Sequence, residues 1–391
     1  MATIADAFAV IRNGANIKQG LDNSGYPITR IETISNRTVD RNKMGYAGVT
    51  DISKYSDYVL QNGDILMSHI NSETHLGKVA LYEKQENETI IHGMNLLCLR
   101  PKQELLNSRF VFYYLSSEAF MRQIPRITKK SVNQASFNVA ALKELSIPIL
   151  AIEIQRDIVR SLDKTNELIA LRKKQLTKLD QLVKSRFIEL FGDPEKNTFC
   201  WKEQPLSEHL NVIGGYAFKS EQFSEYGIPV LRIGNINSGF FRPINLVYWE
   251  DDHALSRYKM HPGDLVMSLT GTVGKDDYGN VCILGNDYAE YYLNQRNAKL
   301  ELHDTINKYY LSMLLKFEPI KKKLTGISRG VRQANISNKD ILNLSVPIPP
   351  IELQNQFATF VEQTDKSKLA IQQSLDKLEL LRKSLMQEYF G

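Results

Sequence analysis

The chain contains one unit that occurs twice. Residues 134–192 align with residues 333–391 at a constant offset of 199 and without a gap, and 19 of the 59 aligned positions are identical. Unrelated segments would share roughly one position in fifteen, given the usage of the common residues. A solenoid needs three or more units of about 20–50 residues, so two units this long indicate a duplicated domain instead.

The first part of each unit repeats less closely. The segment Gly63–Ser68, which reads Gly-Asp-Ile-Leu-Met-Ser, corresponds to Gly263–Ser268 at an offset of 200, and Gly25–Ile31 corresponds to Gly227–Ile233 at an offset of 202. Changing offsets reflect insertions and deletions, which loops tolerate. The sequence therefore predicts two heads with variable loops, each followed by a better-matched tail. Two related sites with different specificity would give this pattern, and so would a duplication followed by simple divergence.

Each tail is predicted to form one long helix. Residues 152–191 contain neither proline nor glycine, and apolar residues recur every seven positions, as in a packing seam, at Leu162, Ile169, Leu176, Val183 and Leu190. In the second tail, Ile371, Leu378 and Leu385 are seven residues apart, with Leu375 and Leu381 between them. A helix of this length spans roughly 60 Å. Such a long seam favours two helices that pack on each other over the alternative, two separate amphipathic helices that each fold on their own head.

The heads are predicted to be mixed, strand-rich domains, which makes the fold class α+β. Strands are expected after the turns at Gly63 and Gly263 and over residues 90–99 and 291–302. Helices are expected over residues 108–121 and 307–323. The expected organisation is a first head at 1–147, a first spacer helix at 148–192, a second head at 193–346 and a second spacer helix at 347–391.

The composition is compatible with a polyanionic partner. The 391 residues carry a net charge of +5 at pH 7, and 42% of them are hydrophobic, which is ample for packed cores. The three cysteines are scattered, so neither a disulfide framework nor a zinc site is expected. No secretory signal and no membrane span are expected, and a cytoplasmic location fits.

No catalytic set is expected in this chain. The segment Gly271–Lys275 suggests a phosphate-binding loop, but Leu269 and Asp276 stand where a Walker-type loop needs Gly and Ser or Thr. The seven histidines lack metal-ligand spacing. No acid, base or nucleophile set is common to both halves, so an autonomous enzyme is not expected, nor is a bound metal.

Two pairs of matching loops offer polar and cationic side chains. The first pair is 69–78 and 269–275, for which an ordinary hairpin with a polar turn is an equally good interpretation. The second pair is 126–134 and 328–333, which is basic and directly precedes the repeated tail, and here nucleic acid is favoured over a solvated loop. Two arginines that correspond in the repeat, Arg30 and Arg232, are added to the residues of these loops. The candidate DNA-binding residues are then Arg30, His69, Asn71, Ser72, Thr74, Lys78, Arg126, Lys129, Lys130, Asn133, Gln134, Arg232, Thr270, Thr272, Lys275, Arg329, Arg332 and Gln333.

The duplicated junctions carry a family resemblance. They read Leu-Ser-Ile-Pro-Ile and Ile-Glu-x-Gln within residues 145–155, and Leu-Ser-Val-Pro-Ile-Pro-Pro-Ile-Glu-Leu-Gln at residues 344–354. Together with Gly63–Ser68 they resemble the specificity subunit of type I restriction–modification systems, over essentially the whole chain. The resemblance implies that each head is a target recognition domain for one half of a split, asymmetric double-stranded DNA site, and that the helices form an antiparallel coiled coil that spaces the heads.

The resemblance also implies the partners. Two methyltransferase subunits are expected to dock on the helices, at residues that include Leu162, Ile169, Leu176, Val183, Leu375, Leu378 and Leu381, and two restriction subunits are expected to join. This chain is expected to bind no cofactor, whereas the methyltransferase is expected to use S-adenosylmethionine. An antiparallel return of the second helix would create a pseudo-twofold with two unlike readers. The alternative is a non-catalytic adaptor whose two heads bind proteins.

Overall fold

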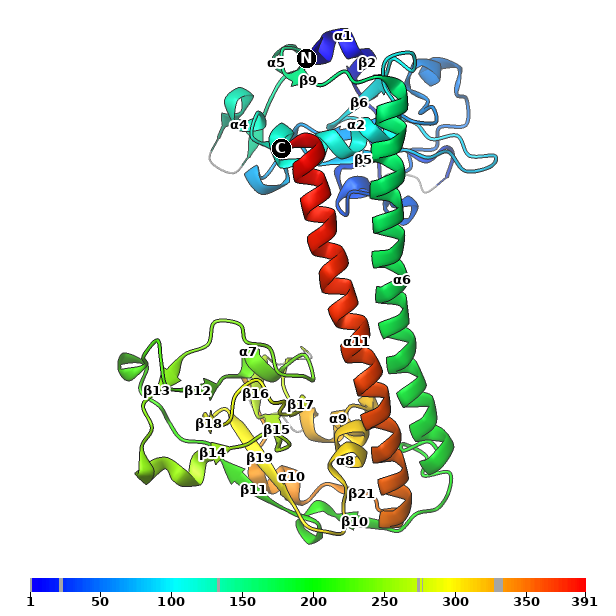
Figure 1. The fold of residues 1–391 in the computed structure, drawn as a ribbon. Coiled ribbons are helices and arrows are strands. Elements are labelled where there is room, and N and C mark those ends of the chain that lie inside the picture. Colours follow the sequence, from blue (N-terminus) through cyan, green and yellow to red (C-terminus); the bar gives the residue numbers. More distant parts are fainter. Residues whose placement is uncertain (1, 21–23, 132–133, 273–274, 276, 327–332) are drawn as a thin grey trace. The chain divides into compact units, whose positions relative to one another are not determined.

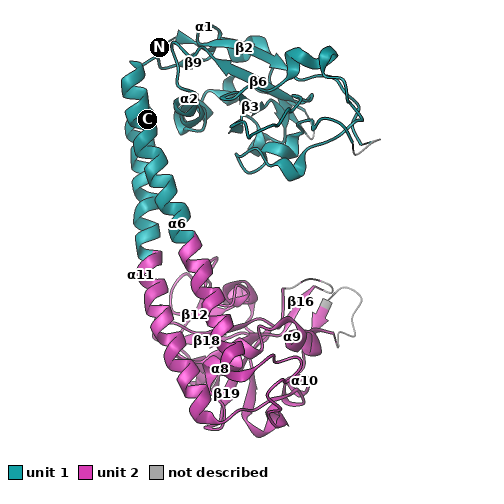
Figure 2. Ribbon diagram, turned by 90° about the vertical axis from the view of Figure 1, so that its right-hand side faces the viewer, with its two compact units in different colours: residues 1–173, 373–391 teal, residues 174–372 magenta. Residues whose placement is uncertain are grey.

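The chain forms two compact units in a computed structural model that describes residues 2–20, 24–131, 134–272, 275, 277–326 and 333–391. Unit one comprises residues 1–173 and 373–391, and unit two comprises residues 174–372 (Figure 2). Two helices of 40 residues each, α6 (Ile152–Phe191) and α11 (Ile351–Phe390), contribute to both units (Figure 1). Each predicted tail is therefore a single long helix, as the sequence indicated.

The remaining elements of unit one belong to the first head. Its strands are β1 (Ala2–Thr3), β2 (Phe8–Asn13), β3 (Ile65–Ser68), β4 (Ile70–Asn71), β5 (Val79–Leu81), β6 (Leu96–Pro101), β7 (Lys129–Lys130), β8 (Ala135–Ser136) and β9 (Ser146–Ile147). Its helices are α1 (Ile4–Ala7), α2 (Ser108–Leu115), α3 (Glu118–Met121), α4 (Ile124–Ile127) and α5 (Val139–Lys143).

The second head supplies the remaining elements of unit two. Its strands are β10 (Glu203–Pro205), β11 (Leu210–Gly214), β12 (Ile228–Leu231), β13 (Tyr248–Trp249), β14 (Lys259–Met260), β15 (Leu265–Ser268), β16 (Thr270–Thr272), β17 (Val281–Ile283), β18 (Tyr291–Leu293), β19 (Asn297–Leu302), β20 (Gln333–Asn335) and β21 (Ser345–Pro347). Its helices are α7 (Ile233–Ile236), α8 (Lys308–Leu314), α9 (Glu318–Thr325) and α10 (Asn338–Leu342).

The main sheets of the two heads have the same topology. The order is β2-β6-β3-β5 in the first head and β11-β19-β15-β17 in the second, and all neighbours are antiparallel. The strands predicted after Gly63 and Gly263 are β3 and β15, which lie inside these sheets and are completely buried. Both predictions are confirmed.

The repeated Gly-Asp pair closes the turn before the inner strand. Gly63 and Gly263 have φ of +90° and +91°, in the left-handed region that glycine adopts without strain. The next residue, Asp64, accepts a hydrogen bond from the Gln61 N–H at 2.7 Å and pairs with Arg100 on β6 at 2.7 Å. Asp264 makes the same contacts with the His261 N–H and Lys299, both at 2.9 Å. This part of the repeat is therefore structural.

Four predicted elements differ from their expected bounds: three are divided in two, and one begins later than expected. The helix predicted over 108–121 is two helices, α2 and α3, because the Ser117 side chain caps a new helix at the Phe120 N–H. The helix over 307–323 is likewise divided into α8 and α9, and α9 has a proline in its first turn. In the strand predicted over 90–99, Asn95 has φ of +72° and forms a turn, so β6 begins only at Leu96. The strand predicted over 291–302 is divided into β18 and β19.

Within each unit the long helices pack on each other in antiparallel sense. In unit one, Ile158 and Leu162 share a core with Phe390, and Lys173 pairs with Glu379 at 2.8 Å. In unit two, Asp180 pairs with Lys368 at 2.7 Å, while Val183 and Phe187 share a core with Phe357 and Val361. In both units, as the residue numbers increase along α6, the residue numbers of its contacts on α11 decrease. The alternative of two separate helices is therefore wrong.

Among the described residues, no helix has the length and apolar character required to cross a membrane.

Candidate nucleic-acid interface

In unit one, strand pairing joins the two predicted loops of the first head. Asn71 of β4 lies opposite Ala135 of β8, and Lys130 of β7 lies opposite the same residue. The order β4-β8-β7 makes a small three-stranded sheet. We call residues 69–78 and 126–136 ribbon one, of which residues 132 and 133 lie outside the described chain. Segments that are distant in sequence thus form one polar surface.

Ribbon one exposes hydrogen-bond donors, acceptors and cations. The hydroxyls of Ser72 and Thr74 each lie 3.0 Å from Nδ1 of His75, and all three side chains are exposed. The other exposed candidates are Arg126, Lys129, Lys130 and Gln134, whereas Asn71 and Lys78 are partly buried and Asn133 falls outside the described residues.

One acidic side chain belongs to this cationic surface. Glu73 Oε1 lies 2.6 Å from Lys130 Nζ, and the two side chains are 65% and 68% exposed. Such an exposed pair contributes at most about 1 kcal/mol, so Lys130 can exchange Glu73 for another anion at little cost. Sequence reasoning did not select Glu73, although it stands between the candidates Ser72 and Thr74.

His69 does not present its ring to the surface of ribbon one. The side chain is 6% exposed and packs edge-on against Phe137, with 6.3 Å between ring centroids. Burial lowers the pKa of His69, so the ring is neutral near pH 7. The residue lies beneath the ribbon and supports it.

In unit two, the described parts of the corresponding segments pair as two strands, β16 and β20. Thr270, Gly271 and Thr272 of β16 lie opposite Asn335, Ala334 and Gln333 of β20. We call residues 270–278 and 333–335 ribbon two, as far as they are described. Lys275 is exposed and Thr270 is partly buried, whereas Arg329 and Arg332 lie outside the described residues. The backbone of Gln333 is part of β20.

Asp277 fixes the turn of ribbon two. Its carboxylate accepts the Thr272 N–H at 2.7 Å and the Thr272 hydroxyl at 2.8 Å, and these hydrogen bonds help to lower the pKa of Asp277 despite partial burial. Asn237 donates its Nδ2 to the carbonyl of Asp277 at 2.7 Å and so holds the loop after α7 against the ribbon. Sequence reasoning missed both residues. Thr272, a candidate for DNA contact, has its hydroxyl engaged in this turn.

The matched arginines begin short helical turns and lie outside both ribbons. The Arg30 N–H donates to Thr33 Oγ1 at 2.8 Å, and the Arg232 N–H donates to Asn235 Oδ1 at 2.9 Å. The Arg30 side chain is exposed, whereas the Arg232 guanidinium donates to the carbonyl of Asn245.

A duplicated glutamine joins each head to the start of its spacer helix. Gln155 is fully buried, accepts a hydrogen bond from the Asn107 N–H and donates to the carbonyls of Leu105 and Leu150, all at 2.8 Å. Gln354, also fully buried, accepts from the Asn307 N–H and donates to the Pro349 carbonyl, both at 2.8 Å. The Gln in the repeated Ile-Glu-x-Gln is therefore structural.

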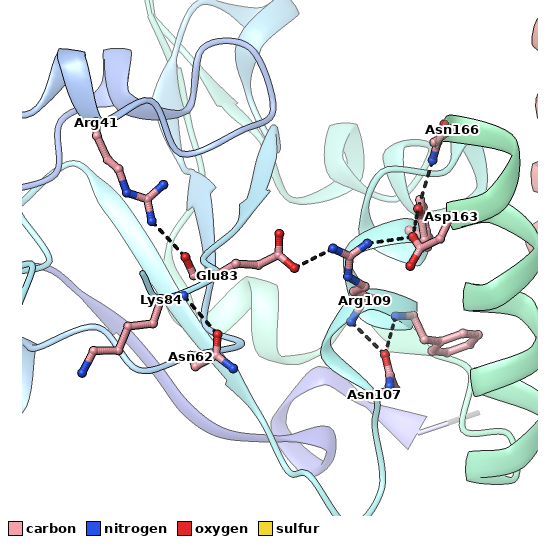
Figure 3. A network of polar contacts seen from close by, with 10 residues as sticks. Arg41, Asn62, Glu83, Lys84, Asn107, Arg109, Asp163 and Asn166 are labelled. Carbon is pink, nitrogen blue, oxygen red and sulfur yellow. Dashed lines mark hydrogen bonds and ion pairs between the residues drawn. The ribbon is translucent and has the colours of Figure 1, made fainter. Parts of the chain in front are cut away.

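Ion pairs add a second link between the first head and α6. The Arg109 guanidinium on α2 lies between Glu83 and Asp163, 2.8 Å from the Asp163 carboxylate (Figure 3). The Tyr113 hydroxyl also donates to Asp163 and receives a hydrogen bond from Asn166 at 3.0 Å. Two consecutive turns of α6 thus fix the direction of the helix relative to the head.

The predicted partner-docking residues divide between the seam and the surface. Leu162, Ile169, Val183 and Leu375 are buried, and Leu176 and Leu378 are partly buried. Leu381 is 47% exposed. Four other leucines that point outward are exposed to a similar or greater degree: Leu171, Leu182, Leu369 and Leu380. Leu182 and Leu381 occupy matched positions of the repeat. The outward leucines are therefore the ones that a partner could cover.

Within the described parts of the chain, no group of three or more His, Cys, Asp or Glu side chains is arranged to hold a metal ion.

Comparison with known proteins gives one consistent family. The model of the type I restriction modification DNA specificity domain matches twice, at residues 1–181 and 200–380. The type I restriction enzyme MjaX specificity subunit of Methanocaldococcus jannaschii is 30% identical over 98% of this chain and 90% of its own length. The MjaVIII specificity subunit of the same organism is 24% identical over 84% of this chain and 79% of its own length.

Solved structures share the fold. The type I restriction–modification S subunit from M. genitalium superposes with a TM-score of 0.59 at 17% identity, over 100% of this chain and 95% of the other. A chain from a study of complex assembly and conformational transition in the type I restriction–modification system gives a TM-score of 0.56 at 16% identity, over 100% and 96% of the two chains.

Proposed function

The chain belongs to the type I restriction–modification DNA specificity family and is a specificity subunit with two specificity domains, and from this premise we propose that each head reads one half of a split, asymmetric DNA site. One observation carries the proposal. In each unit, two polar loops that are distant in sequence are paired into one ribbon, β4-β8-β7 in the first head and β16-β20 in the second. The adaptor alternative, in which the heads bind proteins, is set aside because both halves of the chain match a DNA specificity domain.

The ribbons carry the chemistry that DNA recognition requires. Exposed lysines and arginines neutralise phosphates without reading sequence, whereas amides, hydroxyls and carboxylates discriminate between base edges in the major groove. Ribbon one offers Lys129 and Arg126 for the first task and Asn71, Ser72 and Thr74 for the second. Because the loops of the two heads differ in sequence, the two half-sites differ as well.

We further propose that the paired helices set the gap between the half-sites and dock two methyltransferase subunits, joined by two restriction subunits. The outward leucines of α6 and α11 support a docking role, since a partner that covers them would remove their exposed apolar area from water. Methyl transfer, with S-adenosylmethionine as donor, and DNA cleavage would then belong to the partners, and this chain would bind no cofactor. The complex would act on DNA in the cytoplasm.

The test is to map methylated adenines by single-molecule sequencing in a host with and without this chain, in the presence of its partner methyltransferase. We expect one split, asymmetric motif that depends on the chain. Purified chain alone, incubated with the methyl donor and DNA, should leave the DNA unmethylated. A motif that persists without the chain, or a continuous symmetric motif, would refute the proposed function.

A further inference from the structure

The Arg37 guanidinium of unit one has no partner among the described residues. The side chain is partly buried, and its Nη1 is shielded from solvent without an acceptor. Among the residues that the structure describes, no hydrogen bond or ion pair involves the Arg37 side chain. Buried polar groups are satisfied in the great majority of cases, so each exception requires a reason.

A second guanidinium makes this position more unusual. Arg382 on α11 is close enough to Arg37 that its positive charge, after the larger effect of burial, lowers the pKa of Arg37. Arg382 is exposed and also makes no ion pair among the described residues. Two neighbouring like charges without an acid destabilise the free chain, and an anion bound beside them would reverse that effect.

The repeat shows that the fold needs neither arginine. Arg37 has φ of +60°, a left-handed conformation that is strained for arginine. At the offset of 202 that relates Gly25–Ile31 to Gly227–Ile233, the corresponding residue is Gly239, with φ of +78°. Arg382 corresponds, at the offset of 199, to Val183, which is buried in the core of unit two. Unit two therefore builds the same turn and the same helix with uncharged residues.

We infer that Arg37 and Arg382 form an anion site at the junction of the first head with α11, and that its ligand is a phosphodiester group of the bound duplex. This inference rests on the proposed function and adds a contact outside both ribbons. A guanidinium presents a planar set of N–H donors that matches two phosphate oxygens, and two such groups can hold one phosphate from two sides. The contact would strengthen binding without reading any base, because the phosphate is the same in every sequence.

The first experiment measures DNA affinity. The full chain, in complex with its methyltransferase partner, is titrated with a duplex that contains the mapped motif, at several salt concentrations. The variants R37G and R382V introduce the residues of the other half of the repeat. Each should weaken binding roughly five- to tenfold and reduce the slope of log affinity against log salt, because a contact to the phosphate is lost. The methylated motif should stay unchanged. R122A, which alters an exposed arginine elsewhere in unit one, serves as the control.

The second experiment measures the thermal stability of the free chain and separates the site from a structural role. R37G should raise the melting temperature, since it removes an unpaired charge and relieves the left-handed strain. Millimolar inorganic phosphate should raise the melting temperature of the wild-type chain and have a smaller effect on R37G.

The outcomes are distinct. A lower melting temperature for R37G with an unchanged salt slope would make Arg37 a structural residue and overturn the inference. An unchanged slope with weaker binding of the methyltransferase would assign the site to an acidic protein partner, which also overturns it. If the wild-type complex shows no sequence-specific binding, the proposed function fails, while the phosphate effect on the melting temperature still tests the anion site.

Discussion

At the residue scale, Gln155 and Gln354 show how a single buried side chain can fix the junction between a head and its helix. Gln155 satisfies one backbone N–H and two carbonyls where the chain enters α6. A buried polar group that loses its partner costs about 1–3 kcal/mol. The matched contacts of Gln354 indicate that both halves use the same device.

We predict that Q155L lowers the free energy of unfolding of unit one by about 3 kcal/mol, because three backbone groups lose their partner. Denaturant unfolding of the full chain gives this value, and hydrogen exchange at the amide of Asn107 localises it. Q354L should have the same effect in unit two. Q181A, which alters an exposed position of α6, is the control. A loss as small as that of Q181A would mean that the junction is held by other contacts.

A second prediction concerns the cations of ribbon one. Lys129 is exposed and has no ion pair among the described residues, whereas Lys130 is paired with Glu73. If both contact phosphate, K129A and K130A should each weaken binding to all duplexes and lower the salt slope by about one. K130A should also leave Glu73 near the phosphates, so it should weaken binding more. A loss confined to the cognate site, with an unchanged slope, would instead mean that the lysine reads a base.

At the element scale, the predictable parts are those in which local pattern and burial agree. The apolar runs after Gly63 and Gly263 became central strands, and the proline-free tails became single helices. The breaks at Ser117 and Asn95 were missed because one side-chain cap or one left-handed residue outweighed the surrounding propensity. The ribbons could not be derived either. Pairing of β4 with β8 closes a long loop, and nothing local in the sequence specifies it.

The candidate site follows the same division. Sequence selected the loops that pair into the two ribbons, but it could not distinguish their exposed members from their buried ones. Nothing in the loop composition indicates that His69 lies beneath the ribbon while Thr74 lies on it. Arg37, Glu73 and Asn237 were overlooked because their roles depend on neighbours that only the fold supplies.

The spacer helices carry the prediction that belongs to this scale. Residues 174–177 of α6 and 375–378 of α11 lie near the facing pair of Lys173 and Glu379. Deleting both four-residue segments shortens each helix by about 6 Å, which is nearly two base pairs at roughly 3.4 Å each. The remaining apolar residues Leu179 and Val183 continue the seam.

We expect the two recognised half-sites to keep their sequences and the unread gap to contract by one or two base pairs. Four residues turn a helix about 40° beyond one full turn, whereas two base pairs rotate DNA by roughly 70°, so some twist of the helix pair is required. The methylated motif reports the gap directly. Deletion from α6 alone is the control, since it misaligns the seam and should weaken assembly. An unchanged gap after the paired deletion would show that the helices do not set the spacing.

At the scale of the whole molecule, strand pairing closes each head at the base of its helix. In the first head, β1 pairs with β9, so Ala2 lies opposite Ile147. In the second, β10 pairs with β21, so Glu203 lies opposite Pro347. The first and last strands of a head thus meet immediately before the spacer helix begins. A head closed in this way is a module that can be replaced without changing the helix.

The last prediction uses this closure. Residues 201–350 should be exchanged for the corresponding segment of a relative with a different motif, because these limits keep β10 and β21 together and leave Gln354 in its own helix. One half of the methylated motif should then become that of the relative, while the other half and the gap stay unchanged. Exchange of residues 1–150 should change the opposite half. The reason is that each ribbon is built entirely within one head, so all of its side chains are replaced together with the exchanged segment. If both halves changed after one exchange, or neither did, the heads would not be independent readers.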